Sequence, residues 1–417
     1  MAISLTKLKS DITILSDQFK SKTLSLGLWL DVGSVSEKDN QVGIAHMLEH
    51  MAFKGTKSRN AYQIAREIED IGGDINAYTG KERTAYYVRL LPENLDLGID
   101  ILSDILINSI FPRDEIERER GVIISEIGQS NDSPDDKVYE NFVSTSFNGQ
   151  SLGNSILGTE QTVNSFKQND LVKFCDEFYN TSNLIIGVCG DFEKENFIQQ
   201  VNEKFINFRL GLKTKKPIYR WCSGNFIEER DLEQSNIIFG LEGLCSSDKE
   251  RYALRALTII YGYGMSSKLF QEIREKRGLC YSIYGFCSQY SSSGTFGFSS
   301  GCSPENLEQL LECSIRELIK LRGNIREDDL KRAKLQLKSG LLMSQESSMS
   351  RLEQNVSSIL TFNKIMTIDE TIKNIEELNI SKIENVLDKI LQNIKPVLSI
   401  VGPNSSIFNK IDLKSYF

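Results

Sequence analysis

Short apolar runs alternate along this chain with segments whose apolar residues recur every three to four positions. The first pattern predicts β-strands, and the second predicts amphipathic helices that bury one face. Each half of the sequence reads as two strands, two helices, two strands, several helices and a last strand. This order favours an α+β fold, in which helices pack on an antiparallel-rich sheet.

The strand pattern occurs twice at a nearly constant separation. The apolar run that ends at Gly33 has a counterpart that ends at Gly243, an offset of 210 residues. The run that ends at Gly190 has a counterpart that ends at Gly402, an offset of 212 residues. Two similar offsets at opposite ends of the halves predict two homologous domains.

The boundary between the two domains is predicted in residues 211–217, a basic stretch that contains a proline and interrupts the apolar pattern. The predicted domains are therefore 1–212 and 218–417. Each has roughly 200 residues, an ordinary size for one domain.

The chain contains two histidines, His46 and His50. Residues four apart lie on one face of a helix, so both rings can reach a single ion. Glu49 lies beside them, which gives the order H-x-x-E-H, in which the histidines bind Zn²⁺ and the glutamate acts on water. The alternative is an amphipathic helix that merely carries two histidines. The neighbours that would bury such a helix are Ile44, Ala45, Met47, Leu48 and Met51.

A catalytic zinc ion with one open position needs a third protein ligand. All eight cysteines lie far downstream of His50 and none forms a C-x-x-C pair. The best candidate is Glu126, in a helix predicted to begin just after Pro112. Glu119 lies seven residues earlier on the same face, so one carboxylate could ligate while the other orients a histidine ring. Taken alone, each glutamate could also belong to a solvated helix face.

These residues and the following stretch Met51–Thr56 resemble the pitrilysin, insulinase and mitochondrial processing peptidase family. The resemblance extends from about Gly33 to Val401. It implies a zinc-dependent metalloendopeptidase with one zinc ion per chain and two domains that form half of a clamshell chamber. The implied roles are zinc ligand for His46, His50 and Glu126, general base for Glu49, and support of the site for Glu119.

Further matches concern substrate contacts. The stretch Asn76–Thr79 resembles the edge strand that pairs with substrate in this family, so Asn76, Ala77 and the nearby Phe53 are expected to bind peptide. In the second half, Arg274 and Tyr281 resemble a pair that reaches the substrate, where the tyrosine stabilises the tetrahedral intermediate. Without the resemblance, these two would be explained as a helix-end arginine and a packed strand tyrosine.

The second domain is predicted to be metal-free. A shift of 210 residues takes the two histidines to Ala256 and Ile260, in a helical segment without ligands. The following Tyr261–Gly264 lacks the Lys-Ser/Thr of a P-loop and the G-x-G-x-x-G fingerprint, so no nucleotide site is predicted there.

An acidic pair suggests a substrate preference. Asp136 and Glu140 lie one helical turn apart beyond the Glu126 helix. In processing peptidases, acidic residues in this region receive an arginine near the cleavage site. Our hypothesis is that Asp136 and Glu140 select basic residues, with a solvated acidic face as the alternative. The net charge of −8 is compatible with cationic peptides and argues against nucleic acid.

Location and assembly follow less directly from the sequence. No secretory or transit segment and no membrane-spanning run is recognisable, and the cysteines lack a disulfide framework, so we expect a cytoplasmic protein. The bias toward Ile, Lys and Asn favours a bacterial source. A mature mitochondrial matrix chain is the alternative.

The family chamber needs four domains, which implies a homodimer, or a heterodimer with a metal-free relative. A non-catalytic core subunit, as in respiratory complexes, is the alternative from another functional class.

Overall fold

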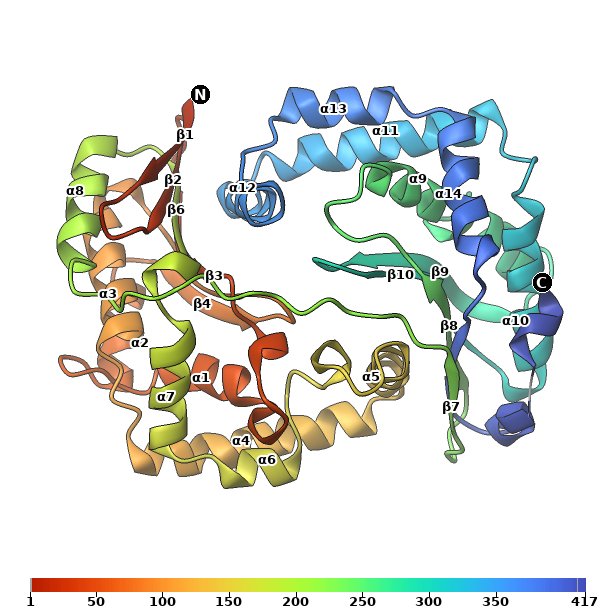
Figure 1. Cartoon of the computed structure of the whole chain (residues 1–417), viewed down its shortest axis with the longest axis horizontal. Helices are drawn as coiled ribbons and strands as arrows, with labels where there is room; N and C mark the ends of the chain where they lie inside the picture. The colour runs from red at the N-terminus through yellow and green to blue at the C-terminus, as the bar shows by residue number, and fades with distance from the viewer. Residues whose placement is uncertain (1, 411) are drawn as a thin grey trace. The chain divides into compact units, whose positions relative to one another are not determined.

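The computed structural model describes residues 2–410 and 412–417, and it folds into two α+β units (Figure 1). Both units combine one sheet with packed helices, so the predicted fold class is confirmed. The first unit contains Met1–Gly128, Asn154–Lys216 and Met343–Met366. The second unit contains Gln129–Gly153, Pro217–Leu342 and Thr367–Phe417.

The sheet of the first unit is mixed, because β2 and β6 are parallel whereas its other neighbouring strands are antiparallel. Strand β3 is buried along its whole length because side chains on both of its faces are covered. Strand β4 ends the sheet and pairs only with β5 among the described strands. In spatial order the strands are β1 (Ala2–Lys7), β2 (Thr13–Gln18), β6 (Leu184–Gly190), β3 (Leu24–Leu30), β5 (Thr84–Leu90) and β4 (Asp74–Thr79).

The helices of the first unit include both predicted site helices. The helix with the two histidines is present as α1, and the helix predicted after Pro112 begins at Arg113 as α4. The helices are α1 (Ile44–Ala52), α2 (Ala61–Glu69), α3 (Leu95–Ile107), most of α4 (Arg113–Asp132), α6 (Glu160–Ser165), α7 (Gln168–Phe178), α8 (Lys194–Lys204) and α12 (Ser348–Phe362).

The second unit has a similar sheet, in which β9 ends one edge next to β10. Its strands, in spatial order, are β7 (Gly224–Glu228), β11 (Val397–Val401), β8 (Ser235–Glu242), β10 (Gly294–Cys302) and β9 (Cys280–Gln289). Its helices are α5 (Pro134–Ser146), α9 (Arg251–Gly262), a π-helical turn (Phe270–Glu275), α10 (Leu307–Lys320), most of α11 (Glu327–Ser344), α13 (Ile368–Glu376) and α14 (Ile380–Gln392). Within the described ranges, neither unit has a helix with both the length and the apolar character needed to cross a bilayer.

The internal duplication is visible in the sheets. Strand β6 lies between β2 and β3, and β11 lies between β7 and β8, with the same parallel and antiparallel pairings. Gly190, the last residue of β6, and Gly402, the residue that follows β11, have φ angles of 143° and 144°. A Cβ at Gly402 would lie 2.6 Å from the Cα of Ser235, so both its conformation and its contact require glycine.

Two helices belong to the unit that is formed mainly by the other half of the sequence. Helix α5, from the first half, packs on β8 and β11 of the second unit, and α12, from the second half, packs on β3 and β6 of the first. The units therefore differ from the predicted domains 1–212 and 218–417, although the central division lies at the predicted linker, between Lys216 and Pro217. The physical reason is that a helix covers whichever apolar sheet face it can bury, whatever its place in the chain.

Candidate metal centre

Helix α1 is fixed at its start by a distant carboxylate. The helix begins after Gly43, whose φ of 96° suits glycine and which has no side chain to cap the first turn. Glu37 takes that role, because its two carboxylate oxygens accept hydrogen bonds of 2.9 Å from the N–H groups of Gly43 and Ala45. Burial raises the pKa of Glu37 to about 8, against the opposing effect of these two bonds. The start of the helix is thus defined just before His46.

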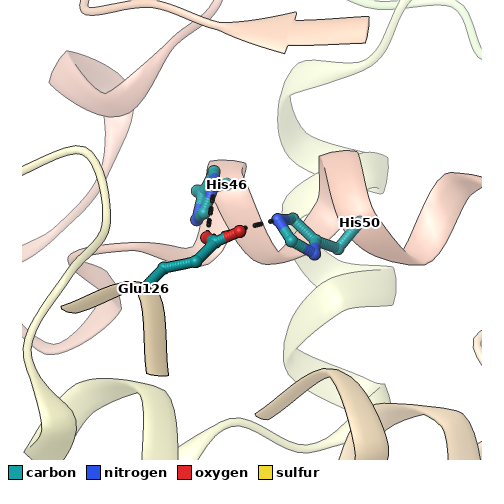
Figure 2. Close-up of side chains that lie close together, drawn as sticks. All are labelled: His46, His50 and Glu126. Carbon is teal, nitrogen blue, oxygen red and sulfur yellow. Dashed lines mark ion pairs between the residues drawn. The ribbon is translucent and has the colours of Figure 1, made fainter. Parts of the chain in front are cut away.

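The two histidines and Glu126 face one another (Figure 2). The Nε2 atoms of His46 and His50 each lie 3.6 Å from Glu126 Oε2. One ligand atom from each of the three residues lies within 4.8 Å of the other two, and no other such group occurs among residues 2–410 and 412–417. Helix α1 supplies the histidines and α4 supplies the glutamate, so two elements far apart in sequence form one ligand set.

The chemistry of this set fits a zinc ion. Burial, and secondarily the charge of His50, lower the pKa of His46 to about 4, so its imidazole is neutral at pH 7 and has a lone pair to donate. The ring atom Nδ1 of His46 is buried without a hydrogen-bond partner among the described residues, whereas Nε2 is directed at Glu126. Two imidazole nitrogens and one carboxylate are the ligands of a catalytic zinc site with one open position.

Glu119 supports this set from behind His50. Its Oε2 lies 2.9 Å from His50 Nδ1, and its Oε1 lies 2.7 Å from Lys54 Nζ. Burial raises the pKa of Glu119, but the hydrogen bonds from Lys54 and His50 outweigh this effect and hold it below its ordinary value. An ionised Glu119 fixes the ring orientation and the tautomer of His50, so that Nε2 is free for a metal.

Glu49 lies next to the edge strand β4. Burial raises the pKa of Glu49, while hydrogen bonds from the side chain and backbone of Thr79 oppose this shift. Thr79 also places its hydroxyl 3.4 Å from the carbonyl oxygen of Ala45. The last residue of β4 therefore contacts both the carboxylate predicted to act as base and the helix that carries the ligands.

The predicted substrate residues of the first unit lie on or near this edge. Asn76 is exposed, whereas Ala77 is buried and its N–H donates to Asn76 Oδ1 at 2.8 Å. Phe53, just after α1, packs edge-on against Tyr86 with ring centroids 6.4 Å apart. The predicted edge position of Asn76–Thr79 is confirmed, while peptide binding by these residues stays a prediction.

Arg274 and Tyr281 contact each other in the second unit. Arg274 Nε donates to the carbonyl oxygen of Tyr281 at 2.9 Å, and its guanidinium lies 5.7 Å from the Tyr281 ring. The Tyr281 side chain is strongly exposed, with 81% of its surface accessible. The geometry places the two residues together, and their role toward a substrate stays a prediction.

Asp136 and Glu140 lie on helix α5, also in the second unit. Asp136 is exposed in the first turn, where Ser133 caps its N–H, and Glu140 is partly buried one turn later. Both carboxylates are thus on one helix as predicted, and their selection of basic residues stays a hypothesis.

Two residues of the centre were not predicted from the sequence. Lys54 belongs to the stretch Met51–Thr56 but lies beyond the end of α1 at Ala52, so its spacing from His50 is not a helical one. Glu37 likewise lies outside the helix that it caps.

The sequence of the chain is similar to those of known proteins. The sequence pattern of the family described as Insulinase (Peptidase family M16) matches residues 13–160, and that of the Peptidase M16 inactive domain matches residues 165–337. An uncharacterized zinc protease of Rickettsia felis is 39% identical over 403 residues, which are 96% of this chain and 98% of that protein.

Solved structures show the same fold. A protease from Helicobacter pylori matches with a TM-score of 0.90 at 23% identity, over 96% of this chain and 100% of that one. A chain of complex III2 from Candida albicans, solved with Inz-5 bound, matches with a TM-score of 0.87 at 18% identity, over 100% of this chain and 99% of that one. At these identities the two structures show similarity of fold alone.

Proposed function

Because the chain belongs to the insulinase family of peptidases, family M16, we propose that it is a zinc-dependent metalloendopeptidase acting on unfolded or presequence-like peptides. The observation that carries this proposal is the ligand set of His46, His50 and Glu126, with all three ligand atoms within 4.8 Å of one another. Its relative in Rickettsia felis is named a zinc protease, which supports zinc as the metal.

The residues of the chain divide the chemistry among them. A zinc ion held by His46, His50 and Glu126 would lower the pKa of a water molecule toward about 7 and polarise the scissile carbonyl. Glu49 takes a proton from the attacking water and delivers it to the leaving amine. Its buried position raises its pKa, which favours the protonated form needed for the second of these steps.

Substrate binding is assigned to the free edge of β4. An extended peptide that adds to this strand gains main-chain hydrogen bonds that tolerate many sequences. The proposal is supported by the edge position of β4 and by the contact of its last residue, Thr79, with Glu49. A peptide on this edge would lie beside the base. Arg274 and Tyr281 are proposed to contact the substrate from the second unit, and the Tyr281 hydroxyl to donate to the developing oxyanion.

The preference for basic residues is assigned to Asp136 and Glu140, whose carboxylates could form charge-assisted hydrogen bonds with an arginine of the substrate. This part of the proposal is supported by their placement one turn apart on α5.

The decisive experiment measures zinc content and cleavage of a basic, quenched fluorescent peptide by the wild type and by Glu49→Gln. We expect about one zinc ion per chain in both proteins and cleavage by the wild type alone, because the substitution removes the base and leaves the three ligands. A wild-type protein without zinc would contradict the metallopeptidase proposal. Zinc in both proteins without any cleavage would instead favour a missing partner chain.

The assembly proposed is a homodimer, with a heterodimer as the competing arrangement. Size-exclusion mass and peptidase activity, measured on one peak of protein expressed alone, separate the two, because a homodimer is active without a partner. We also propose a bacterial cytoplasmic location, supported by the fact that all eight cysteines are unpaired.

A non-catalytic core subunit is the second candidate, because the chain shares its fold with a chain of complex III2. Against it, His46, His50 and Glu126 form one possible ligand set, Glu119 contacts His50, and Glu49 lies near His50 and Glu126, which supports a catalytic site. Peptidase activity that disappears in Glu49→Gln would exclude this second candidate.

A further inference from the structure

Helix α12 covers the sheet face that α1 does not use. Side chains alternate along β3, so that Leu28 and Leu30 join the core that includes α1, whereas Trp29 faces the other way. Trp29 packs there with Leu352 and Val356 of α12. The metal ligands and α12 therefore lie on opposite faces of one sheet, within the first unit.

Polar contacts anchor α12 on this face at several points, among them the side chains of Arg351, Ser348 and Glu353. Arg351 forms a buried ion pair with Asp17 of β2, with a shortest distance of 2.8 Å. The hydroxyl groups of Ser348 and Ser25, which belongs to β3, lie 2.7 Å apart. The third anchor is Glu353, and it alone of these three reaches the strand at the edge of the sheet.

Glu353 links the edge strand β4 to the middle of the sheet. Its Oε1 accepts hydrogen bonds from Trp29 Nε1 at 2.9 Å and from the Tyr78 hydroxyl at 2.8 Å. Its Oε2 lies 3.7 Å from the guanidinium of Arg83, in the turn that joins β4 to β5. Burial and the charge of Glu353 raise the pKa of Tyr78, so the phenol stays a hydrogen-bond donor at neutral pH.

This link matters because Tyr78 is the neighbour of a residue that contacts the proposed base. Thr79, the next residue of β4, lies close enough to the Glu49 carboxylate to lower its pKa, and its hydroxyl lies 3.4 Å from the carbonyl oxygen of Ala45 in α1. A strand at the edge of a sheet has a partner on one side only, so its end is held by fewer backbone bonds than a central strand. The carboxylate of Glu353 supplies a fixed point, since Trp29 is fully buried and β3 lies in the interior of the sheet.

We propose that Glu353 is a positioning residue for peptide binding, which acts through Tyr78 to hold the β4 edge in register with the metal centre. This inference rests on the proposed function, because it needs a peptide that pairs with β4. Helix α12 then does more than cover apolar surface. Through Glu353, a helix from the second half of the sequence fixes the position of β4, the proposed substrate-binding strand of the first unit.

The test compares Glu353→Leu, Glu353→Gln, Tyr78→Phe and the double variant Glu353→Leu/Tyr78→Phe. For each, kcat and KM are measured on a zinc-loaded enzyme with a peptide of about ten residues. The affinity of the same peptide is measured by fluorescence anisotropy in a Glu49→Gln background, which does not depend on turnover. Zinc content is measured in parallel, because the proposal predicts no loss of metal.

We expect Glu353→Leu to raise KM and the peptide Kd about tenfold, with kcat changed less than about threefold, since the strand is displaced while the metal ligands stay in place. Tyr78→Phe should raise KM in the same direction. The double variant should be no worse than Glu353→Leu alone, because the two residues act through one bond. Glu353→Gln retains an acceptor oxygen and should recover most of the affinity.

Ser348→Ala is the matched control. It removes another α12 anchor, to Ser25 of β3, without touching Tyr78. It should lower the unfolding temperature and leave KM unchanged. If Glu353→Leu does not fold, Tyr78→Phe still decides the question, because it leaves the Glu353 bond to Trp29 intact.

The outcomes are distinct. A wild type that cleaves the peptide, together with unchanged KM and Kd in Tyr78→Phe and in the folded Glu353 variants, would overturn this inference and leave the proposed function standing. Equal rises of KM in Ser348→Ala and Glu353→Leu would also overturn it, because the effect would then come from loosening α12 as a whole. A zinc-loaded wild type that neither binds nor cleaves the peptide would overturn this inference for the chain on its own, and, as stated for the proposed function, would favour a missing partner chain.

Discussion

Replacement of Glu119 by glutamine should weaken zinc binding without removing a zinc ligand. The Glu119 carboxylate has two short contacts, to His50 Nδ1 at 2.9 Å and to Lys54 Nζ at 2.7 Å, and its side chain is only 8% exposed. A glutamine has one acceptor oxygen and one NH₂ group in place of two acceptor oxygens. If the amide oxygen of the glutamine accepts from His50, its NH₂ group faces the ammonium of Lys54. If the oxygen instead accepts from Lys54, His50 Nδ1 loses its hydrogen-bond acceptor.

The magnitude follows from the contact to His50. A hydrogen bond to a charged group contributes about 1.5–3 kcal/mol. Only the part of this energy that orients the His50 ring changes the free energy of zinc binding. Loss of such an outer partner raises the metal dissociation constant about 10- to 100-fold, which corresponds to roughly 1.4–2.7 kcal/mol. Glu119→Gln should fall in this range, and Lys54→Met, which leaves the His50 contact in place, should fall below it.

The assay is competition for zinc between the protein and a chromogenic chelator. Glu117→Gln is the matched control, because Glu117 lies on the same helix with a side chain 69% exposed and pairs with Arg120 instead of a ligand. The double variant Lys54→Met/Glu119→Gln should bind zinc more tightly than Glu119→Gln alone, since its NH₂ group no longer faces an ammonium. Equal zinc affinities for Glu119→Gln and Glu117→Gln would refute the reasoning.

Three further predictions test the surroundings of the site. Burial raises the pKa of Glu37 from 4.5 to about 8, so between these pH values the Glu37 carboxyl group is protonated in the folded protein and ionised in the unfolded chain. The contribution of Glu37 to the free energy of unfolding therefore falls as the pH rises from about 4.5 to about 8, by at most about 1.4 kcal/mol per pH unit. Urea unfolding of metal-free protein at pH 6 and 7.5 should show this loss in the wild type and not in Glu37→Gln, and identical pH dependences would contradict it. Arg351→Met should lower the free energy of unfolding by about 3–5 kcal/mol in the same assay, because it leaves the buried carboxylate of Asp17 without its cationic partner. The double variant Asp17→Asn/Arg351→Met should lower it less, and equal losses in the two variants would contradict this explanation. Asp136→Asn/Glu140→Gln should lose the preference for peptides with an arginine near the cleaved bond while neutral peptides are cleaved as before, and an unchanged ratio of kcat/KM between the two peptides would end the hypothesis.

The parts of the site that lie on single helices could be predicted from the sequence. A spacing of four places His46 and His50 on one face, and a spacing of seven does the same for Glu119 and Glu126, because both follow from helix geometry alone. The structure brings the two helices together with these faces toward each other. The contact of Lys54 with Glu119 needed the packing of α1 against α4, which no local spacing describes.

The exchange of α5 and α12 could not be predicted in the same way. Apolar periodicity shows which face of a helix is buried, but it does not show which sheet that face covers. The deciding contacts are polar and distant in sequence, such as the pair of Asp17 with Arg351 and the bond of Trp29 to Glu353. The internal repeat indicates part of this exchange. Helices α5 and α12 each follow a long helix at corresponding places in the two halves, and each belongs to the unit formed mainly by the other half of the sequence.

The duplication also explains why one metal ion per chain is expected. Helix α9 stands in the second unit where α1 stands in the first, and the positions that correspond to the two histidines are Ala256 and Ile260, both fully buried. A cation there would lose its hydration shell without gaining a ligand, which is costly in an apolar core. Helix α9 nevertheless packs next to β9, the edge strand of its own sheet, as α1 does next to β4. The second unit thus has an edge strand next to its helix, while no metal is predicted for it, so a measured content near two zinc ions per chain would contradict that prediction.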